Sequence, residues 1–361
     1  MDESQRGHGI FRARMHEPSL TPPPHRHPNG RFRNPWPGSV EHGVGDALKW
    51  AIERARNGTL GFTPRGTPPA AVAHGDLAQP AGPGECRLTW IGHSSFLIQA
   101  GGLNVLTDPV FADRVSPVSF AGPRRLAPPG IALDALPPID LVLQSHDHYD
   151  HFDAGTIRAL ARRSPSTVWC APLGLAARLR PLGVRHVTEC DWLDSAEPLP
   201  GVRVACVPAR HFSGRTFTDR NTTLWCGWTL RAGASRVYFV GDSAFHPDFG
   251  AVGAREGPFD AVLMPIGAYA PRWFMSAVHM DPEEAVAAFA DVRSAHPGHG
   301  TVMAAMHWGT FVLTDEPVDE PPARARVAWE RHRLEANALW IFAPGETRTL
   351  GGAPPSAEAR P

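Results

Sequence analysis

The sequence carries almost no net charge and almost no lysine. Its 35 Lys and Arg residues are balanced by 36 Asp and Glu residues, which gives a formal net charge of −1 and a pI near 7.0. Lys49 is the only lysine. A chain with this balance creates no overall field that would attract nucleic acid or an anionic membrane. The composition therefore argues against a nuclease, which needs a basic surface.

The sequence also lacks a paired-cysteine motif and a long apolar run. Its five cysteines include no C-x-x-C pair, so we expect reduced, packed thiols in a reducing compartment. The first residues have no apolar core of the kind found in secretion signals, and no run of about 18 apolar residues is present. These absences predict a cytoplasmic protein without a membrane span. The cysteines are Cys86, Cys170, Cys190, Cys206 and Cys226.

Composition divides the chain into three parts. Residues 1–85 are rich in proline, and such a stretch buries too little apolar surface to order itself, so we predict a partly disordered N-terminal arm. One short helix is expected in this arm, roughly from Val44 to Arg56, with Leu48 and Ile52 on its apolar face. We expect the compact domain over residues 86–346 and a flexible tail over residues 347–361.

The most informative stretch is residues 145–151, with the sequence S-H-D-H-Y-D-H. It directly follows the apolar run of residues 139–143, which is typical of a buried strand that ends at a polar site. Histidine and aspartate supply the nitrogen and oxygen ligands that zinc and iron accept, and no cysteine indicates a soft structural site. The alternative is a histidine-rich surface loop, which explains the composition but not the position after a buried strand.

Three later apolar runs, at 202–207, 236–240 and 301–306, are each followed by a side chain that can bind metal. Ligands gather at one set of strand ends in an open sheet, so we expect these donors to meet the 145–151 stretch. The prediction is a pair of ions with a bridging carboxylate. The first ion is assigned to His146, His148 and His211, the second to Asp150, His151 and His307, and the bridge to Asp242.

Each ion would then have three or four protein ligands and an open position, as catalytic rather than structural zinc ions do. Two bridged ions lie about 3.5–4 Å apart and activate a water molecule at neutral pH. Taken alone, Asp242 is also compatible with an ordinary turn aspartate, and His307 with a histidine of the core. Only the combination with residues 145–151 makes the metal interpretation the better one.

These residues resemble the metallo-β-lactamase superfamily, whose H-x-H-x-D-H signature matches residues 146–151. More narrowly, the chain is similar to the N-acyl-phosphatidylethanolamine-hydrolysing phospholipase D family over about residues 86–346. The signature alone identifies only the superfamily, which includes lactamases, lactonases, nucleases and oxidoreductases. The narrower resemblance depends on the segments TDPVF at 107–111, GPRR at 122–125, LPPID at 136–140, PIGAY at 265–269, RWFM at 272–275 and HWGTF at 307–311.

The resemblance implies an α/β fold, the four-layer αβ/βα sandwich, with two Zn²⁺ ions per chain on the ligands named above. It also implies phospholipase D-type hydrolysis of N-acyl-phosphatidylethanolamine to N-acylethanolamine and phosphatidic acid. His148 stands where the diiron relatives carry glutamate, which favours hydrolysis over redox chemistry. One alternative is a hydrolase of the same fold acting on a soluble substrate such as a sugar-phosphate lactone. Another is a non-catalytic metal-binding protein.

Several residues are candidates for catalysis around the metal ions. Asp150 and Asp242 are expected to hold the attacking water, and one of them to accept its proton. His279 matches a histidine that lines the substrate site in the resembled family, and it is expected to bind or protonate the leaving oxygen. Bracing the helix that starts after Asp281 is an equally good interpretation of His279. His93 and Asp108 lie near strand ends and are candidates to orient metal-bound imidazoles.

A second group of candidates concerns the substrate and other partners. An aromatic segment with an arginine would suit an acyl chain and a phosphate headgroup, although core packing is the default for such residues. The group consists of Tyr269, Arg272, Trp273 and Phe274. The expected partners are a phospholipid substrate, the inner face of a membrane through peripheral contact, and a second copy of the chain in a homodimer.

Overall fold

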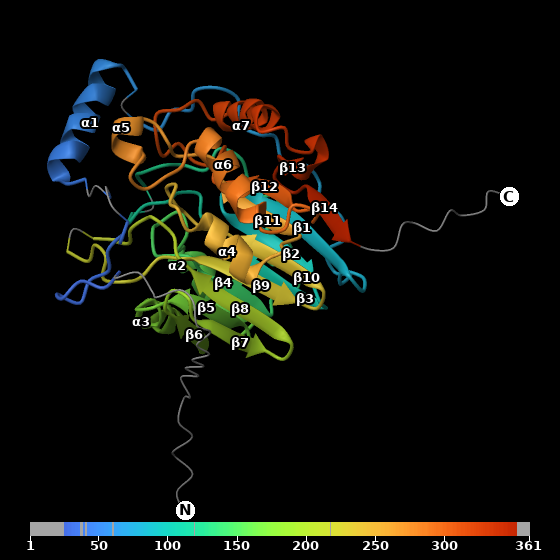
Figure 1. The fold of residues 1–361 in the computed structure, drawn as a ribbon. Helices are drawn as coiled ribbons and strands as arrows, with labels where there is room; N and C mark the ends of the chain where they lie inside the picture. The colour runs from blue at the N-terminus through green and yellow to red at the C-terminus, as the bar shows by residue number, and fades with distance from the viewer. Residues whose placement is uncertain are drawn as a thin grey trace, which may run out of the picture.

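The computed structural model describes residues 25–36, 39, 42–59, 61–118, 120–216 and 218–351. Two seven-stranded sheets pack face to face, and helices lie against their outer faces (Figure 1). The predicted α/β architecture, a four-layer αβ/βα sandwich, is confirmed. The described domain begins with a strand at Glu85, one residue before the predicted boundary.

The first sheet consists of β1 (Glu85–Gly92), β2 (Ser95–Ala100), β3 (Leu103–Thr107), β4 (Leu141–Leu143), β5 (Val168–Pro172), β6 (His186–Cys190) and β14 (Thr347–Gly351). Their order is β14-β1-β2-β3-β4-β5-β6. Successive side chains on a strand point to opposite faces. Phe96 and Ile98 on β2 therefore join the core between the sheets, whereas Leu97 joins the outer layer with α2 (Ala154–Arg163) and α3 (Ala176–Leu179).

The second sheet consists of β7 (Ser195–Leu199), β8 (Val202–Val207), β9 (Gly227–Ala232), β10 (Ser235–Phe239), β11 (Ala261–Pro265), β12 (Val302–Met306) and β13 (Leu339–Trp340). Neighbouring strands from β10 to β13 pair in parallel. All residues of β11 and β12 are buried, because the opposite sheet covers one face and helices cover the other. This double burial explains their continuous apolar runs. The covering helices are α4 (Phe249–Glu256), α6 (Pro282–Arg293) and α7 (Glu320–Arg331).

Two helices begin where capping residues in the sequence predict. Asp153 caps α2 by accepting hydrogen bonds from the backbone N–H groups of Gly155 and Thr156. Asp281 caps α6 in a capping box with Glu284. A side-chain oxygen at this position satisfies an N–H group that has no partner within the helix. Both caps lie beside polar loops, so they fix where those loops meet the helices.

Helix α1 (Val44–Arg56) has the predicted bounds, but its apolar face does not point into the domain. Trp50 Nε1 donates to Asp315 at 2.7 Å, and Arg54 pairs with the same carboxylate at 2.9 Å. These bonds turn the opposite side of the helix outward, so Leu48 is 61% exposed and Ile52 is 44% exposed. In Figure 1, α1 stands at one side of the molecule next to α5 (Arg272–Met275).

Residues 25–36, which lie within the predicted N-terminal arm, pack against the domain. Phe32 and Trp36 are buried in the main core cluster, and each such side chain stabilises the fold by about 1.5–3 kcal/mol. His25 Nε2 bonds to Asp191 at 2.7 Å, and Trp36 Nε1 donates to Asp248 at 3.0 Å. A few well-placed aromatic side chains thus order a stretch whose average composition suggests disorder. Residues 1–24 lie outside the described residues.

Residues 347–351, at the start of the predicted flexible tail, belong to the first sheet. These residues form β14, which pairs with β1 in an antiparallel register from Thr89↔Thr347 to Glu85↔Gly351. The pairing is possible because β1 would otherwise end the sheet with an unpaired edge. Residues 352–361 lie outside the described residues.

The cysteines agree with the sequence-based expectation, since all five are free and buried. Burial raises the pKa of the Cys86 thiol to about 12, and it also raises the pKa values of the other four thiols. Thiols of this kind are poor nucleophiles. Within the described ranges, none of the helices is long and apolar enough to cross a membrane.

Strand β14 gives a direct test of the corrected C-terminal boundary. Ending the chain before Thr347 removes five residue pairs with β1 and should lower the free energy of unfolding by about 2–4 kcal/mol. A chain ending at Gly351 keeps every one of these pairs and is the matched control. Urea unfolding measures both chains. Equal stability of the two truncated chains would contradict the assignment of β14 as part of the sheet.

Candidate metal centre

The four predicted donor segments converge because their strands end at the same edge of the sandwich. His146 and its neighbours follow β4, His211 follows β8, Asp242 follows β10, and His307 directly follows β12. Five of the seven predicted ligands are buried, and the other two, His148 and Asp150, are partly exposed. The structure brings all seven predicted ligands together. They are His146, His148, Asp150, His151, His211, Asp242 and His307.

The first donor group contains three imidazoles. His148 Nδ1 lies 2.9 Å from His146 Nε2 and 3.1 Å from His211 Nε2. His211 Nδ1 donates to the carbonyl oxygen of Val278 at 2.9 Å, so its Nε2 carries a lone pair. His146 Nδ1 lies 2.8 Å from Ser145 Oγ, which itself donates to Asp108, so His146 Nε2 also carries a lone pair. Two lone pairs thus point at one place, which suits a cation.

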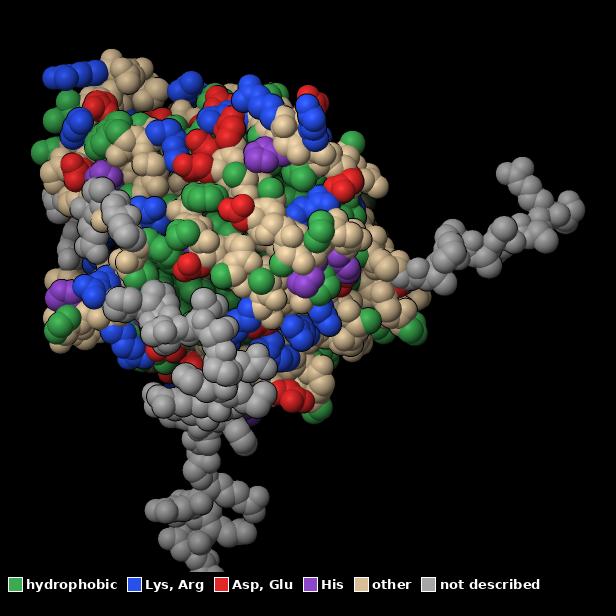
Figure 2. Space-filling model, in the orientation of Figure 1, with side chains coloured by type: hydrophobic (Ala, Val, Ile, Leu, Met, Phe, Trp, Pro, Cys, Tyr) green, Lys and Arg blue, Asp and Glu red, His purple; other side chains and the backbone are tan. Residues whose placement is uncertain are grey.

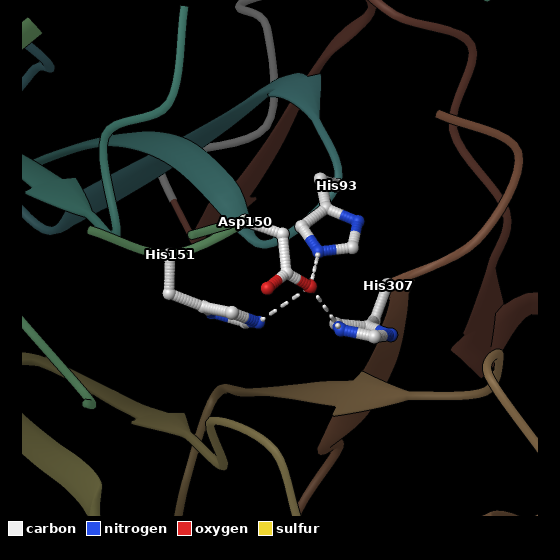
Figure 3. Close-up of side chains that lie close together, drawn as sticks. All are labelled: His93, Asp150, His151 and His307. Atoms are coloured by element: carbon white, nitrogen blue, oxygen red, sulfur yellow. Dashed lines mark hydrogen bonds and ion pairs between the residues drawn. The ribbon is translucent and has the colours of Figure 1, made fainter. Parts of the chain in front are cut away.

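The second donor group is arranged around Asp150. Its Oδ2 lies 3.5 Å from the Nε2 atoms of both His151 and His307, and 3.0 Å from His93 Nε2. Figure 3 shows the three rings approaching the same carboxylate oxygen from different elements. All four donor atoms lie within 4.8 Å of one another. The group therefore contains the three predicted ligands together with His93.

Asp242 lies between the two groups, as a bridging ligand should. Its Oδ2 is 3.0 Å from His151 Nε2 and 3.0 Å from His307 Nε2. The same oxygen is 3.8 Å from His211 Nε2 in the first group. The other oxygen, Oδ1, is buried and has no hydrogen-bond partner among the described residues. One carboxylate thus faces both donor groups, which is the arrangement that a pair of bridged cations requires.

Asp108 anchors the second group from behind. It accepts a hydrogen bond from His151 Nδ1 at 2.7 Å and from the backbone N–H of Ser145 at 2.7 Å. Because the Nδ1 proton of His151 is used in this bond, its Nε2 faces Asp242, and the nearby carboxylates outweigh burial and raise the pKa of His151 well above its usual value. Two unshared pairs at 3.0 Å repel each other unless a proton or a cation lies between them. The sequence named Asp108 as a candidate to orient a ligand, and the structure confirms this contact.

The backbone at this edge adopts unusual conformations. His93, Asp108 and His307 have positive φ angles of 56°, 29° and 61°, a region that non-glycine residues rarely adopt. Gly241 has a φ of 66°, and a Cβ atom on it would lie 2.7 Å from the carbonyl oxygen of Cys226. Only glycine fits there, which lets Asp242 follow immediately. Such conformations cluster at functional sites, where the surrounding structure holds them in place.

Burial and charge divide the ionisable groups of the site into two kinds. Burial lowers the pKa of His148 to about 4 and the pKa of His211 to about 3, so both imidazoles are neutral at pH 7. Burial also opposes protonation of His307, but the nearby Asp242 and Asp150 outweigh it and raise the pKa of His307 to about 9. Although burial would raise them, the pKa values of Asp150 and Asp242 lie well below the usual range, because His151 faces both.

These observations test whether the site fits metal ions. Neutral imidazoles with converging lone pairs and ionised carboxylates are the forms that bind divalent cations. Without a metal, the second donor group holds protons between its ring nitrogens and carboxylate oxygens. A cation can replace these protons. The donors are nitrogen and oxygen only, as zinc, iron and manganese accept. The residues present therefore fit a pair of divalent cations.

His279 joins the edge of this cluster, whereas the other predicted substrate residues do not. Its ring centroid is 5.0 Å from that of His211 and 5.2 Å from that of His307. Its Nδ1 is buried and has no hydrogen-bond partner among the described residues. Burial lowers the pKa of His279 well below its usual value, so the ring is neutral at pH 7.

The remaining predicted substrate residues have structural partners. The Tyr269 hydroxyl donates to Glu320 on α7 at 2.6 Å, and Arg272 pairs with Glu284 at 2.7 Å. Trp273 Nε1 donates to Glu53 on α1 at 3.0 Å, and Phe274 packs against Trp50 with a ring-centroid distance of 5.2 Å. Contact of these four residues with a substrate stays a prediction.

Sequence reasoning missed the role of Asp147, although it lies inside the central motif. Asp147 is buried and accepts hydrogen bonds from the backbone N–H of Gly214 at 2.8 Å and from Thr223 Oγ1 at 3.1 Å. Arg178 pairs with it at 3.1 Å. The residue thus ties the 145–151 stretch to the loop that carries His211. Its partners are distant in sequence, so no local pattern could have identified this role.

Comparisons with known proteins agree with the geometry. A family model described as a beta-lactamase superfamily domain matches residues 103–308, more than half of the chain. An uncharacterised protein of Mycobacterium tuberculosis is 47% identical over 247 residues, which are 67% of this chain and 64% of that protein. The chain thus spans less than two thirds of that relative's length. The N-acyl-phosphatidylethanolamine-hydrolyzing phospholipase D 1 of Caenorhabditis elegans is 40% identical over 243 residues, which are 64% of this chain and 67% of that protein.

A solved structure supports the same fold. Igni18, a metallo hydrolase from the hyperthermophilic archaeon Ignicoccus hospitalis, superposes with a TM-score of 0.55 and 21% identity over 74% of this chain and 98% of its own. At this identity the likeness concerns the fold alone. Since the family model covers most of both sheets and the whole 145–151 stretch, the chain belongs to the metallo-β-lactamase superfamily.

Proposed function

We propose that the chain is a dinuclear zinc hydrolase that cleaves N-acyl-phosphatidylethanolamine into N-acylethanolamine and phosphatidic acid. The observation that carries this proposal is the shared carboxylate of Asp242, which faces two separate donor groups. The choice of substrate draws on the C. elegans relative, whose name states this activity. In the reaction, water adds to phosphorus, and the bond from phosphorus to the oxygen of the N-acylethanolamine breaks.

Different residues of the site are proposed to bind the metal ions, to orient the ligands and to accept a proton. The proposed first site is His146, His148 and His211, the second is Asp150, His151 and His307, and Asp242 faces both. When bound, a pair of zinc ions lowers the pKa of water and polarises the phosphoryl oxygens. Asp108 holds His151 in the tautomer that presents Nε2, and His93 holds Asp150 in place. Asp150 and Asp242 are the two carboxylates proposed to accept a proton from the attacking water.

His279 is proposed to act on the leaving oxygen. The ring faces the same space as His211 and His307, and its buried Nδ1 is not used by any described residue. Arg272 fixes the loop around it by donating to the carbonyl oxygen of His279 at 3.0 Å. A neutral imidazole held there can donate a hydrogen bond to the oxygen of the departing N-acylethanolamine as its negative charge develops.

Contact with a lipid surface is proposed through α1. Leu48 and Ile52 lie one turn apart on its exposed side, and Lys49 lies between them in the sequence. A phospholipid substrate brings the protein to such a surface, where exposed apolar side chains gain free energy by burial. Figure 2 shows basic and acidic side chains mixed over the visible face, which gives no support to nucleic acid as a partner.

The metal proposal predicts the effect of replacing Asp242. The variant Asp242→Asn keeps the shape of the side chain but removes the charge that faces both donor groups. We expect the wild-type chain to bind two zinc ions, and the variant to lose at least one of them and more than about 100-fold in kcat. Elemental analysis and a lipid-hydrolysis assay measure the two effects. The exposed Asp134→Asn is the control, and a variant at Asp242 with full zinc and full activity would contradict the proposal.

The substrate proposal predicts both the products and the role of His279. Purified protein should release N-acylethanolamine and phosphatidic acid from N-acyl-phosphatidylethanolamine, as seen by mass spectrometry, and should not open sugar-phosphate lactones. The variant His279→Ala should lose about 100-fold or more in kcat while keeping the zinc content of the wild type. His74→Ala, at an exposed histidine, is the control. Turnover of lactones alone would rule out the lipid reaction.

The lipid-contact proposal predicts that the double variant Leu48→Asp/Ile52→Asp binds vesicles of phosphatidylethanolamine and phosphatidylcholine at least about 10-fold more weakly. Co-sedimentation measures the binding. Its hydrolysis of a detergent-dispersed substrate should stay unchanged, because α1 holds no proposed ligand. Val327→Asp changes an apolar residue that is 46% exposed on α7 and is the matched control. Equal vesicle binding by both variants would show that α1 is not the contact.

A further inference from the structure

A short N-terminal segment outside the family match contacts the loop that carries one proposed metal ligand. We call residues 25–36 the N-terminal strap and residues 208–226 the β8–β9 loop. The strap precedes the range 103–308 matched by the family model. It nevertheless reaches the β8–β9 loop at several backbone positions, one of which is His211 itself. Through these contacts the strap can stabilise the fold and can also set the geometry of the metal centre.

The hydrogen bonds from the strap end on backbone carbonyl groups of the loop. Arg31 donates to the carbonyl oxygen of Thr218 at 2.9 Å and also to that of Arg220. The backbone N–H of Phe32 donates to the carbonyl oxygen of Asn221 at 2.8 Å. Asn34 Nδ2 donates to the carbonyl oxygen of His211 at 2.8 Å. The strap thereby satisfies acceptors in an irregular loop that has no long strand ladder to satisfy them.

The strap itself is firmly held, so it can act as a fixed reference for the loop. Its two ends are tied to different parts of the domain. His25 and Arg26 both bond to Asp191, at 2.7 and 2.6 Å. Trp36 is 8% exposed, stacks on His246 at a centroid distance of 4.5 Å and donates to Asp248. Asn34 lies between these anchored ends.

The side of His211 opposite the strap faces the metal centre. Its Nδ1 donates to Val278, and its Nε2 lies 3.1 Å from His148 Nδ1 and 3.8 Å from Asp242 Oδ2. The His211 residue is therefore fixed at the ring by Val278 and at the backbone by Asn34. The Oδ1 atom of Asn34 is buried and has no hydrogen-bond partner among the described residues. The side-chain amide of Asn34 therefore bonds to the described residues through Nδ2, which donates to the carbonyl oxygen of His211.

We propose that Asn34 is a positioning residue for the metal centre, acting through the backbone carbonyl of His211. By fixing the peptide plane of His211, Asn34 fixes the direction from which Nε2 approaches the first donor group. Ligand atoms need to be held within about 0.5 Å of the productive geometry for tight binding. This inference rests on the proposed metal function, because it needs His211 to be a ligand.

Three variants separate positioning from general stability. Asn34→Ala removes the bond to His211. Asn34→Asp keeps the shape but sets a carboxylate oxygen against the carbonyl oxygen. Asn29→Ala is the matched control, because Asn29 is exposed on the same strap and bonds only within it, to the backbone N–H of Arg31 at 3.0 Å. All are made in the full chain.

The first measurement uses the metal-free protein, and the second uses zinc alone as the probe. Hydrogen exchange of peptides from residues 208–226 should speed up in both Asn34 variants but not in Asn29→Ala. Competition with a chromophoric chelator should show one of the two zinc ions bound about 10-fold more weakly in both Asn34 variants, with the other unchanged. Thermal unfolding of the metal-free variants shows how much global stability has changed.

The outcomes distinguish this inference from the proposed function. If the wild-type chain binds no zinc under these conditions, the metal function itself fails. If wild type binds two zinc ions and both Asn34 variants bind them as tightly as Asn29→Ala does, Asn34 has no positioning role and only this inference fails. If zinc affinity falls but exchange increases over the whole domain rather than in residues 208–226, the strap is a general stabiliser and the inference is again overturned.

Discussion

The structure depends on the burial of facing imidazole and carboxylate groups at one edge of the two sheets. Removing such groups from water is unfavourable unless each finds a partner. Here the lone pairs of His146 and His211 point at the same place, and His151 Nε2 lies 3.0 Å from a carboxylate oxygen of Asp242. A pair of divalent cations offsets these costs together, because it takes the place of several protons at once. The fold therefore brings together groups that suit a pair of divalent cations.

Several residues that hold this arrangement have unfavourable backbone conformations. Three non-glycine residues at the site, His93, Asp108 and His307, have left-handed backbone angles, and Asp242 depends on a glycine before it. Hydrogen bonds accepted by Asp108, Val278 and Asp147 then fix the ligand rings and the loops that carry them. The two sheets form a rigid scaffold, and the loops at their ends carry the candidate functional side chains, as is usual in α/β proteins.

Much of the centre could be predicted from the sequence, because its ligands follow apolar strands. Residues His211, Asp242 and His307 come from three separate strands, and their shared position after an apolar run was enough to place them beside the 145–151 stretch. The helix caps at Asp153 and Asp281 depend on neighbours within a few residues, so a local sequence pattern is enough to predict such caps. These features are local, or they follow from the rule that strand ends converge.

Features that depend on distant partners could not be predicted. The order of residues 25–36 depends on Asp191, Trp192 and Asp248, which are more than 150 residues away. Strand β14 pairs with the otherwise free edge of β1. Trp273 donates a hydrogen bond to Glu53 on α1 rather than to a residue of the metal centre. Specific tertiary contacts decide the structure of these segments, and average composition does not reveal such contacts.

The proposed function requires seven donors from four separate segments to hold a pair of cations. Anomalous X-ray diffraction from crystals of the zinc-loaded chain, measured on both sides of the zinc absorption edge, tests it most directly. We expect two anomalous peaks, one among His146, His148 and His211 and one among Asp150, His151 and His307, with Asp242 between them. No peak there, or a single peak outside these residues, would contradict it.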